Sequence, residues 1–212
     1  MNMEIGNLVI VLGVIFFSMT IHEVMHGLIA YYLGDDTAKA QGRLTLNPLK
    51  HIDPFLTILL PILLAVSGGP IFGGAKPVPF NPTRIRYGEW GVALVGLAGP
   101  LVNLLLAFIA FGLGVLVDPT QGSLLQSILF YAVWVNLGFF VFNMLPLPPL
   151  DGSRVLYALA PDFVRRGMEV IERFGIWVIL IIVLLASSLI GGFMMAAIQG
   201  ILRVFEAIFG VQ

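Results

Sequence analysis

Long apolar stretches dominate the pattern of hydrophobic and polar positions and predict membrane-spanning helices. A helix needs about 20 apolar residues to cross the hydrocarbon core of a bilayer. Stretches of about this length or more occupy residues 5–33, 91–117, 123–145 and 176–204. A fifth apolar run, residues 55–66, is short and contains Pro61. We therefore expect this run to be a re-entrant segment that does not cross the membrane.

The polar stretch between the first span and the short run predicts a different structure. Residues 37–54 read TAKAQGRLTLNPLKHIDP, in which Thr, Gly, Asn and Pro recur, as in short strands joined by turns. Residues 37–46 are the best candidate for an edge strand at the membrane surface, because an edge strand presents free backbone groups that can pair with another extended segment. The predicted fold is an all-α membrane protein with about four transmembrane helices, a re-entrant segment and short membrane-edge β-strands. We expect residues 1–212 to form one domain.

The composition of the chain is typical of a membrane protein and argues against nucleic-acid binding and against a metal site with cysteine ligands. Hydrophobic residues make up 58% of the chain and charged residues 11%, whereas charged residues are about 25% of a soluble domain. The net charge is −1 and no run of Lys or Arg occurs, so no nucleic-acid partner is expected. Because the chain has no cysteine, a metal site must use His, Asp or Glu.

The distribution of basic residues predicts the orientation of the spans. Residues 118–122, between the second and third spans, contain no Lys or Arg. The Lys and Arg of short loops mark the cytoplasmic side, which places the N-terminus outside and the other loops in the cytoplasm. The protein is therefore expected to be a multi-pass protein of the cell membrane. Ten of the eleven basic residues lie in these cytoplasmic loops: Lys39, Arg43, Lys50, Lys76, Arg84, Arg86, Arg154, Arg165, Arg166 and Arg173.

The first span contains the pattern H-E-x-x-H, formed by His22, Glu23 and His26. Residues i and i+4 share one helix face, so both imidazoles can reach one metal ion. Glu23 lies about 100° round the helix, where it can contact a metal-bound water without being a ligand. The alternative is a pair of buried histidines bonded to neighbouring helices. The cost of burying a carboxylate within a span favours the metal site, which lies nearer the cytoplasmic end of the span.

A catalytic zinc ion usually takes three protein ligands, so a third must come from elsewhere in the chain. The candidates are His51, Asp53 and Asp151. Asp151 follows a Pro-rich stretch that unwinds the end of the third span and lets the chain turn back toward the first helix. It could instead cap a helix that begins at the following residue. His51 lies between two prolines, where it could support the metal site or bond to a loop.

Two further stretches carry a resemblance to a known family. Residues 143–152 read NMLPLPPLDG, which resembles the N-x-x-P-x-P-x-L-D-G signature of the site-2 protease family of intramembrane zinc metalloproteases. Residues 98–103 (AGPLVN) and 73–82 (GGAKPVPFNP) are similar to segments of compact prokaryotic members that lack PDZ and CBS domains. The resemblance implies one zinc ion per chain with Glu23 as general base and Asn143 near the scissile carbonyl. Its implied metal ligands are His22, His26 and Asp151.

These observations predict a zinc-dependent intramembrane endopeptidase that hydrolyses peptide bonds within or next to transmembrane segments of membrane-protein substrates. Its expected partners are such a substrate and the lipid bilayer. A metal transporter is the first alternative, since His and Asp in spans can bind ions without hydrolysis. Glu23 beside a ligand and the lack of inverted repeats argue against it. The second alternative, an inactive membrane scaffold, conflicts with the intact motifs. Asn103 and Asn136 are interpreted as polar groups that pack helices together.

Overall fold

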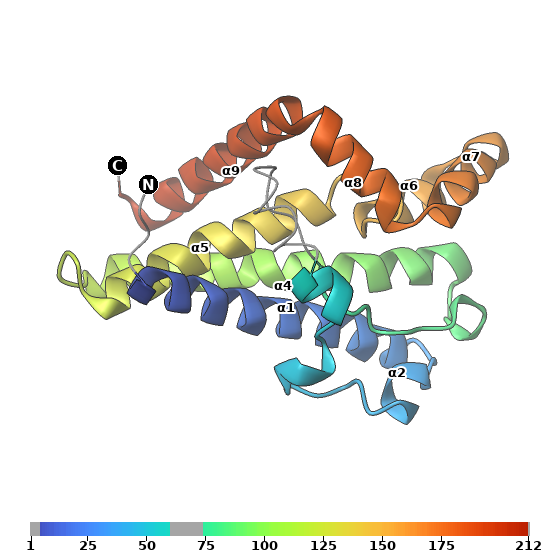
Figure 1. The fold of residues 1–212 in the computed structure, drawn as a ribbon, viewed down its shortest axis with the longest axis horizontal. Helices are drawn as coiled ribbons and strands as arrows, with labels where there is room; N and C mark the ends of the chain where they lie inside the picture. Colours follow the sequence, from blue (N-terminus) through green and yellow to red (C-terminus); the bar gives the residue numbers. More distant parts are fainter. Residues whose placement is uncertain (1–4, 60–73, 212) are drawn as a thin grey trace.

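The computed structural model describes residues 5–59 and 74–211, and its long helices run side by side between two ends (Figure 1). Four helices of the described residues are long and apolar enough to cross a membrane, which confirms four spans and a multi-pass protein. The first residues of the first long helix, the last residues of the fourth, and the connection between the second and third long helices lie at one end of the bundle (Figure 1). They are α1 (Ile5–Tyr32), α4 (Gly88–Val117), α5 (Leu124–Asn143) and α9 (Ser187–Phe209).

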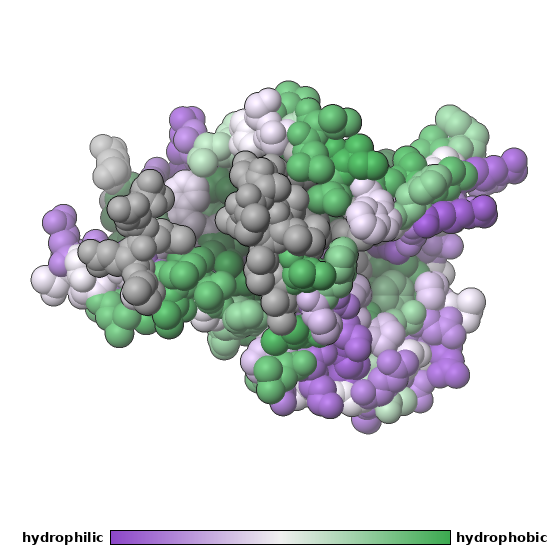
Figure 2. Space-filling model, viewed as in Figure 1, coloured by the Kyte–Doolittle hydropathy of each residue, from purple (hydrophilic) through white to green (hydrophobic). Residues whose placement is uncertain are grey.

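Several of the short elements, among them α2, α6 and α7, lie toward the other end of the bundle (Figure 1). On the face shown in Figure 2, polar side chains are concentrated over α2 and α7, and apolar side chains cover much of the long helices. The segments that carry most of the basic residues therefore share one end of the molecule. The short elements are α2 (Thr37–Ala40), η1 (Pro48–Lys50), η2 (Pro54–Leu59), η3 (Pro82–Arg84), α6 (Gly152–Leu159) and α7 (Asp162–Arg173).

The predicted membrane-edge strands are wrong, because none of residues 5–59 and 74–211 forms a β-strand. Residues 37–46, the proposed edge strand, begin with the helical turn α2. The Asp35 carboxylate accepts hydrogen bonds from the Thr37 N–H (3.1 Å) and hydroxyl (2.5 Å), which fixes the start of that turn. The Arg43 N–H then donates to the Ala38 carbonyl at 2.9 Å. Local hydrogen bonds thus take the N–H groups of residues 40–43, which an edge strand would present.

The last predicted span, residues 176–204, is two helices. The helix α8 (Ile176–Leu185) ends at Ala186, whose φ of −120° and ψ of 24° are not helical, and α9 begins at the next residue. A serine pair at 187–188 follows the break, and serine favours helix starts over helix interiors. The apolar composition runs through this point without interruption, so hydropathy did not reveal it.

The predicted re-entrant run, residues 55–66, lies mostly outside the described residues, which resume at residue 74. The two flanks that are described lie against each other. The Gly74 N–H donates to the Leu56 carbonyl at 3.0 Å, and the Lys76 N–H donates to the His51 carbonyl at 2.9 Å. The described residues before and after this run, 51–56 and 74–76, therefore lie next to each other.

Helix α4 forms the centre of the bundle and packs against α1, α5, α6 and α9. Its buried face is made largely of small residues, which let neighbouring helices approach closely. Near its start this face joins an apolar cluster with Ala30 and Ile85, and further along it joins another with Leu137 and Phe205. The two middle positions of the face, Gly99 and Asn103, lie between these clusters. The buried face includes Val92, Val95, Gly99, Asn103, Ala107 and Ala110.

Candidate metal centre

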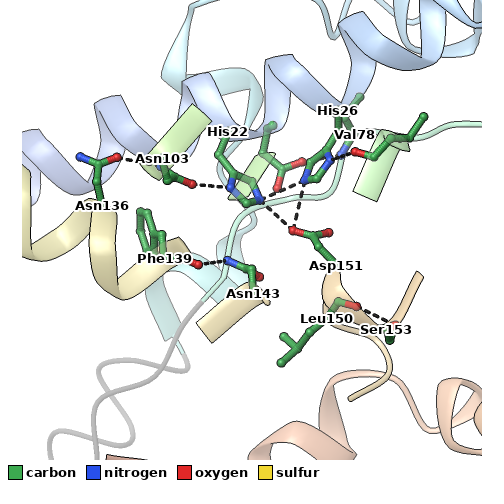
Figure 3. A network of polar contacts seen from close by, with 12 residues as sticks. His22, His26, Val78, Asn103, Asn136, Phe139, Asn143, Leu150, Asp151 and Ser153 are labelled. Carbon is green, nitrogen blue, oxygen red and sulfur yellow. Dashed lines mark hydrogen bonds and ion pairs between the residues drawn. The ribbon is translucent and has the colours of Figure 1, made fainter. Parts of the chain in front are cut away.

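The structure brings together His22, His26 and Asp151, the three residues predicted as metal ligands (Figure 3). The two imidazoles come from successive turns of α1, and their Nε2 atoms lie 3.0 Å apart. Asp151 Oδ2 lies 3.1 Å from the Nε2 of His22 and 3.3 Å from that of His26. Each residue can offer one ligand atom within 4.8 Å of the other two. The geometry therefore fits a single metal ion.

The outer nitrogen of each imidazole lies beside a hydrogen-bond acceptor, which favours a proton on Nδ1. His22 Nδ1 is 2.6 Å from Asn103 Oδ1, and His26 Nδ1 is 2.7 Å from the Val95 carbonyl oxygen. A neutral imidazole that donates from Nδ1 keeps a lone pair on Nε2. In that tautomer, both Nε2 lone pairs point toward the space shared with the Asp151 carboxylate oxygen. Such a set of donors is suited to a divalent cation.

Helix α4 approaches the histidines so closely that only glycine fits at position 99. A Cβ atom there would lie 2.4 Å from His26 Nε2 and 2.6 Å from His22 Nε2. A methyl group would therefore occupy the space in front of both nitrogens. Position 99 was not predicted as part of the site, although it lies within the AGPLVN segment.

Asp151 reaches the histidines because the chain turns back sharply after α5. Gly152 makes this turn possible, since a Cβ atom at that position would lie 2.4 Å from the Met144 carbonyl oxygen. Asp151 occupies the N-cap position of α6, but its side chain makes no capping hydrogen bond. The capping alternative therefore does not describe the carboxylate, which faces the histidines with 23% of the side chain exposed.

Glu23 is buried beside the histidines, with 8% of its surface exposed. Its Oε2 atom accepts a hydrogen bond from the Val78 backbone N–H at 2.8 Å. No residue in the described part of the chain donates to Oε1. One carboxylate oxygen is thus held by the protein and the other is left for water.

The three asparagines near the site differ in what they contact (Figure 3). Asn103 does more than pack helices, because it holds His22 and donates through Nδ2 to Asn136 Oδ1 at 2.7 Å. Asn136 in turn donates to the Ser18 hydroxyl at 2.9 Å. The half-buried Asn143 donates one amide proton to the Phe139 carbonyl of its own helix at 3.0 Å. Its other amide proton has no acceptor among the described residues.

The other two candidates for the third ligand are not part of the group. His51 is fully buried and its Nε2 lies 2.9 Å from the Thr45 carbonyl oxygen. Asp53 accepts hydrogen bonds from the backbone N–H groups of Phe55 (2.9 Å) and Leu56 (2.8 Å). Both side chains therefore hold local turns, and only Asp151 of the three candidates joins the histidines among the described residues.

Comparisons with known proteins agree with this site. The profile of Peptidase family M50 matches residues 118–189, which include Asp151. A Bacillus subtilis protein named "Putative zinc metalloprotease YwhC" is 43% identical over 201 residues, which cover 91% of this chain and 89% of that protein. The Rip2 proteins of Mycobacterium tuberculosis (strain H37Rv) and Mycolicibacterium smegmatis carry the same description. They are 33% and 30% identical and cover 89% and 85% of this chain and 71% and 68% of their own lengths.

No solved structure matches the chain significantly. The similarity to YwhC extends over nearly the whole of both chains. Together with the match to the family profile, it shows that this chain belongs to peptidase family M50, the site-2 protease family that its motifs resemble.

Proposed function

We propose that this protein is a zinc-dependent intramembrane endopeptidase that cleaves membrane-protein substrates within or next to their transmembrane segments. The observation that supports the proposal is the convergence of the Nε2 atoms of His22 and His26, on a membrane-spanning helix, with the carboxylate of Asp151. His22 lies about 26 Å from the start of α1 and about 15 Å from its end at 1.5 Å per residue. A hydrocarbon core is about 30 Å thick, so the site lies at membrane depth.

His22, His26 and Asp151 would hold the zinc ion, because nitrogen and oxygen donors are typical ligands of catalytic zinc. When bound, the ion lowers the pKa of a water molecule toward about 7 and polarises the scissile carbonyl. Glu23 takes a proton from the attacking water through Oε1 and passes it to the leaving nitrogen. The free amide proton of Asn143 is available to stabilise the developing negative charge on the carbonyl oxygen.

The surroundings of the site support a substrate that comes from the bilayer. The proposed catalytic residue Glu23 lies on a helix long and apolar enough to span the membrane, and the segments rich in basic residues gather toward the end of the bundle nearer His22 (Figure 1). The positive-inside rule assigns that end to the cytoplasm. Residues 1–212 then act as one intramembrane protease domain, with the lipid bilayer and a transmembrane protein as its partners.

Cleavage of a membrane-protein substrate by the purified protein in liposomes tests this function. We expect cleavage to stop when a chelator removes zinc and to return when zinc is restored. Glu23→Gln should abolish cleavage and keep the zinc, because Glu23 is not a ligand. The exposed Glu89 on α4 provides the matched control, and Glu89→Gln should leave cleavage unchanged. Wild-type cleavage by Glu23→Gln would contradict the proposed role of Glu23. Cleavage that persists after zinc has been removed would show that the protein is not a zinc-dependent enzyme.

A further inference from the structure

The hydrogen bond on Glu23 comes from an unusual backbone position. Val78 lies between Pro77 and Pro79, and proline has no backbone N–H. The Val78 amide is therefore the single N–H donor of this tripeptide, and it points at Glu23 Oε2 from 2.8 Å. Val78 is 5% exposed and Glu23 is 8% exposed. A backbone donor and a carboxylate are thus paired away from bulk water.

The segment around Val78 is held in place on both sides. The two prolines fix their own φ angles and favour extended conformations for the residues before them. On one side, the Lys76 N–H donates to the His51 carbonyl at 2.9 Å, and its carbonyl accepts from Arg43 Nη2 at 2.8 Å. On the other side, the Asn81 N–H donates to Asp35 Oδ2 at 2.6 Å. The position of the Val78 N–H is therefore set by the surrounding fold.

Helix α1 leaves room for this segment next to the glutamate. Gly27 lies four residues after Glu23, on the same helix face. A Cβ atom at Gly27 would lie 2.9 Å from Val78 Cγ1 and 2.6 Å from Leu44 Cδ2. The absence of a side chain at this position lets the Pro-Val-Pro segment cross α1 close enough for its N–H to reach the carboxylate.

We propose that Val78 is a positioning residue for Glu23, an inference that rests on the proposed function of Glu23 as general base. The Val78 N–H holds Oε2 and thereby turns Oε1 toward the water that Glu23 deprotonates. A carboxylate fixed in this way keeps a productive orientation without reorganising during the reaction. The flanking prolines limit this stretch to one donor, so the carboxylate has a single preferred orientation.

Replacing the Val78 amide by a backbone ester tests the proposal, because the ester removes the N–H and keeps the side chain. We expect kcat in the liposome assay to fall about 10- to 100-fold, as for the loss of a hydrogen bond to a charged group. KM and zinc content should stay at wild-type values. Val78→Pro removes the same N–H by another route and should lower kcat similarly. An ester at Phe80, whose N–H has no acceptor among the described residues, is the matched control and should be active.

The outcomes separate this inference from the proposed function. Wild-type kcat in the Val78 ester would overturn the inference. So would an equal loss in the Phe80 ester, or a loss that appears in KM or zinc content, because each indicates a general disturbance of the segment. Glu23→Gln in the same assay tests the general base itself. An inactive Glu23→Gln beside a fully active Val78 ester would refute only the positioning role, whereas an active Glu23→Gln would refute the role of Glu23.

Discussion

The two halves of the metal centre are built differently. His22 and His26 lie on a long helix, their side chains are 8% and 10% exposed, and each Nδ1 is fixed by an acceptor from α4. Asp151 lies on the turn between α5 and α6, and its side chain is 23% exposed. Within the described part of the chain, its carboxylate contacts the histidines and has no other polar partner. Contacts with α4 thus hold the two histidines, whereas Asp151 is held by its contacts with the histidines themselves.

This difference shows how one site can combine side chains in fixed positions with a side chain that is more exposed. Groups on packed helices keep their geometry better than groups on loops. Contacts with α4 therefore hold the two histidines in an arrangement that one metal ion could use. The turn that carries Asp151 follows Asn143, so the more exposed side of the site is the side with fewer contacts. The following predictions test this contrast.

The largest effect is expected from Gly99→Ala on the histidine side. The added methyl group would lie within 2.6 Å of both Nε2 atoms, and the histidines cannot withdraw because their Nδ1 atoms are held. We expect loss of bound zinc and of cleavage, measured as zinc per chain and substrate turnover. Gly114 on the same helix has no atom near its would-be Cβ, so Gly114→Ala should behave like the wild type. Full zinc in Gly99→Ala would show that the histidine half can rearrange.

Removal of Asp151 should separate the two halves. We expect Asp151→Ala to bind zinc far more weakly and to lose cleavage, because two imidazoles alone make a poor catalytic zinc site. The metal-free variant should remain folded, since α1 keeps its packing against α4 and α5. Zinc content and thermal unfolding measure both effects. Full zinc in Asp151→Ala would remove it as a ligand and return His51 or Asp53 to consideration.

A smaller effect is expected when the support of His22 is removed. Asn103→Leu keeps a similar size but leaves His22 Nδ1 without its acceptor. Loss of a partner that orients a metal-binding histidine typically lowers metal affinity about 10- to 100-fold. Competition with a zinc-binding dye measures this affinity. Asn136→Leu, one hydrogen bond further from His22, should lower it less. An equal affinity in Asn103→Leu and the wild type would refute the fixed histidine half.

The parts of the site that could be predicted depend on local spacing. The placement of two histidines one turn apart follows from helix geometry alone, and the motif around Asp151 identified the third member of the group. Gly99 and the contact between Asn103 and His22 could not be predicted in the same way. They depend on how α4 is rotated against α1, which is set by packing among residues far apart in the chain. Spacing within one helix contains no information about that rotation.

The errors in the predicted fold have a related cause. The polar residues 37–46 have the composition of strands and turns, but the buried Asp35 side chain starts a helical turn there. The four spans were predicted well because their length and apolar composition are demanded by the membrane. The break at Ala186 was missed since it leaves that composition unchanged. The sequence thus predicted the elements imposed by the bilayer better than those decided by single hydrogen bonds.

The smallest effect on the metal centre is expected at Asp35, which connects α1 to the segment that holds Glu23. Asp35 is fully buried and lies after the end of α1. Burial by itself would raise the pKa of its carboxyl group, but hydrogen bonds from Thr37 and Asn81 outweigh it and lower the pKa below its ordinary value of 3.8. A lowered pKa in the folded protein stabilises the fold above the unfolded-state pKa, and this contribution is lost as pH falls through the folded-state value.

Asp35→Asn should therefore lower the free energy of unfolding by about 1–3 kcal/mol at pH 7, the usual range for hydrogen bonds to a charged group. The difference from the wild type should shrink as the pH falls below about 4, where an unfolded Asp becomes protonated. Thermal unfolding in detergent at several pH values measures both. The exposed Asp118 in the α4–α5 connection provides the control, because Asn tolerates the same left-handed backbone, and Asp118→Asn should have little effect. A destabilisation of equal size at pH 3 and pH 7 would mean that the charge of Asp35 does not stabilise the segment around Val78. This segment would then resemble Asp151, which has few contacts, more than the two histidines, which are held by α4.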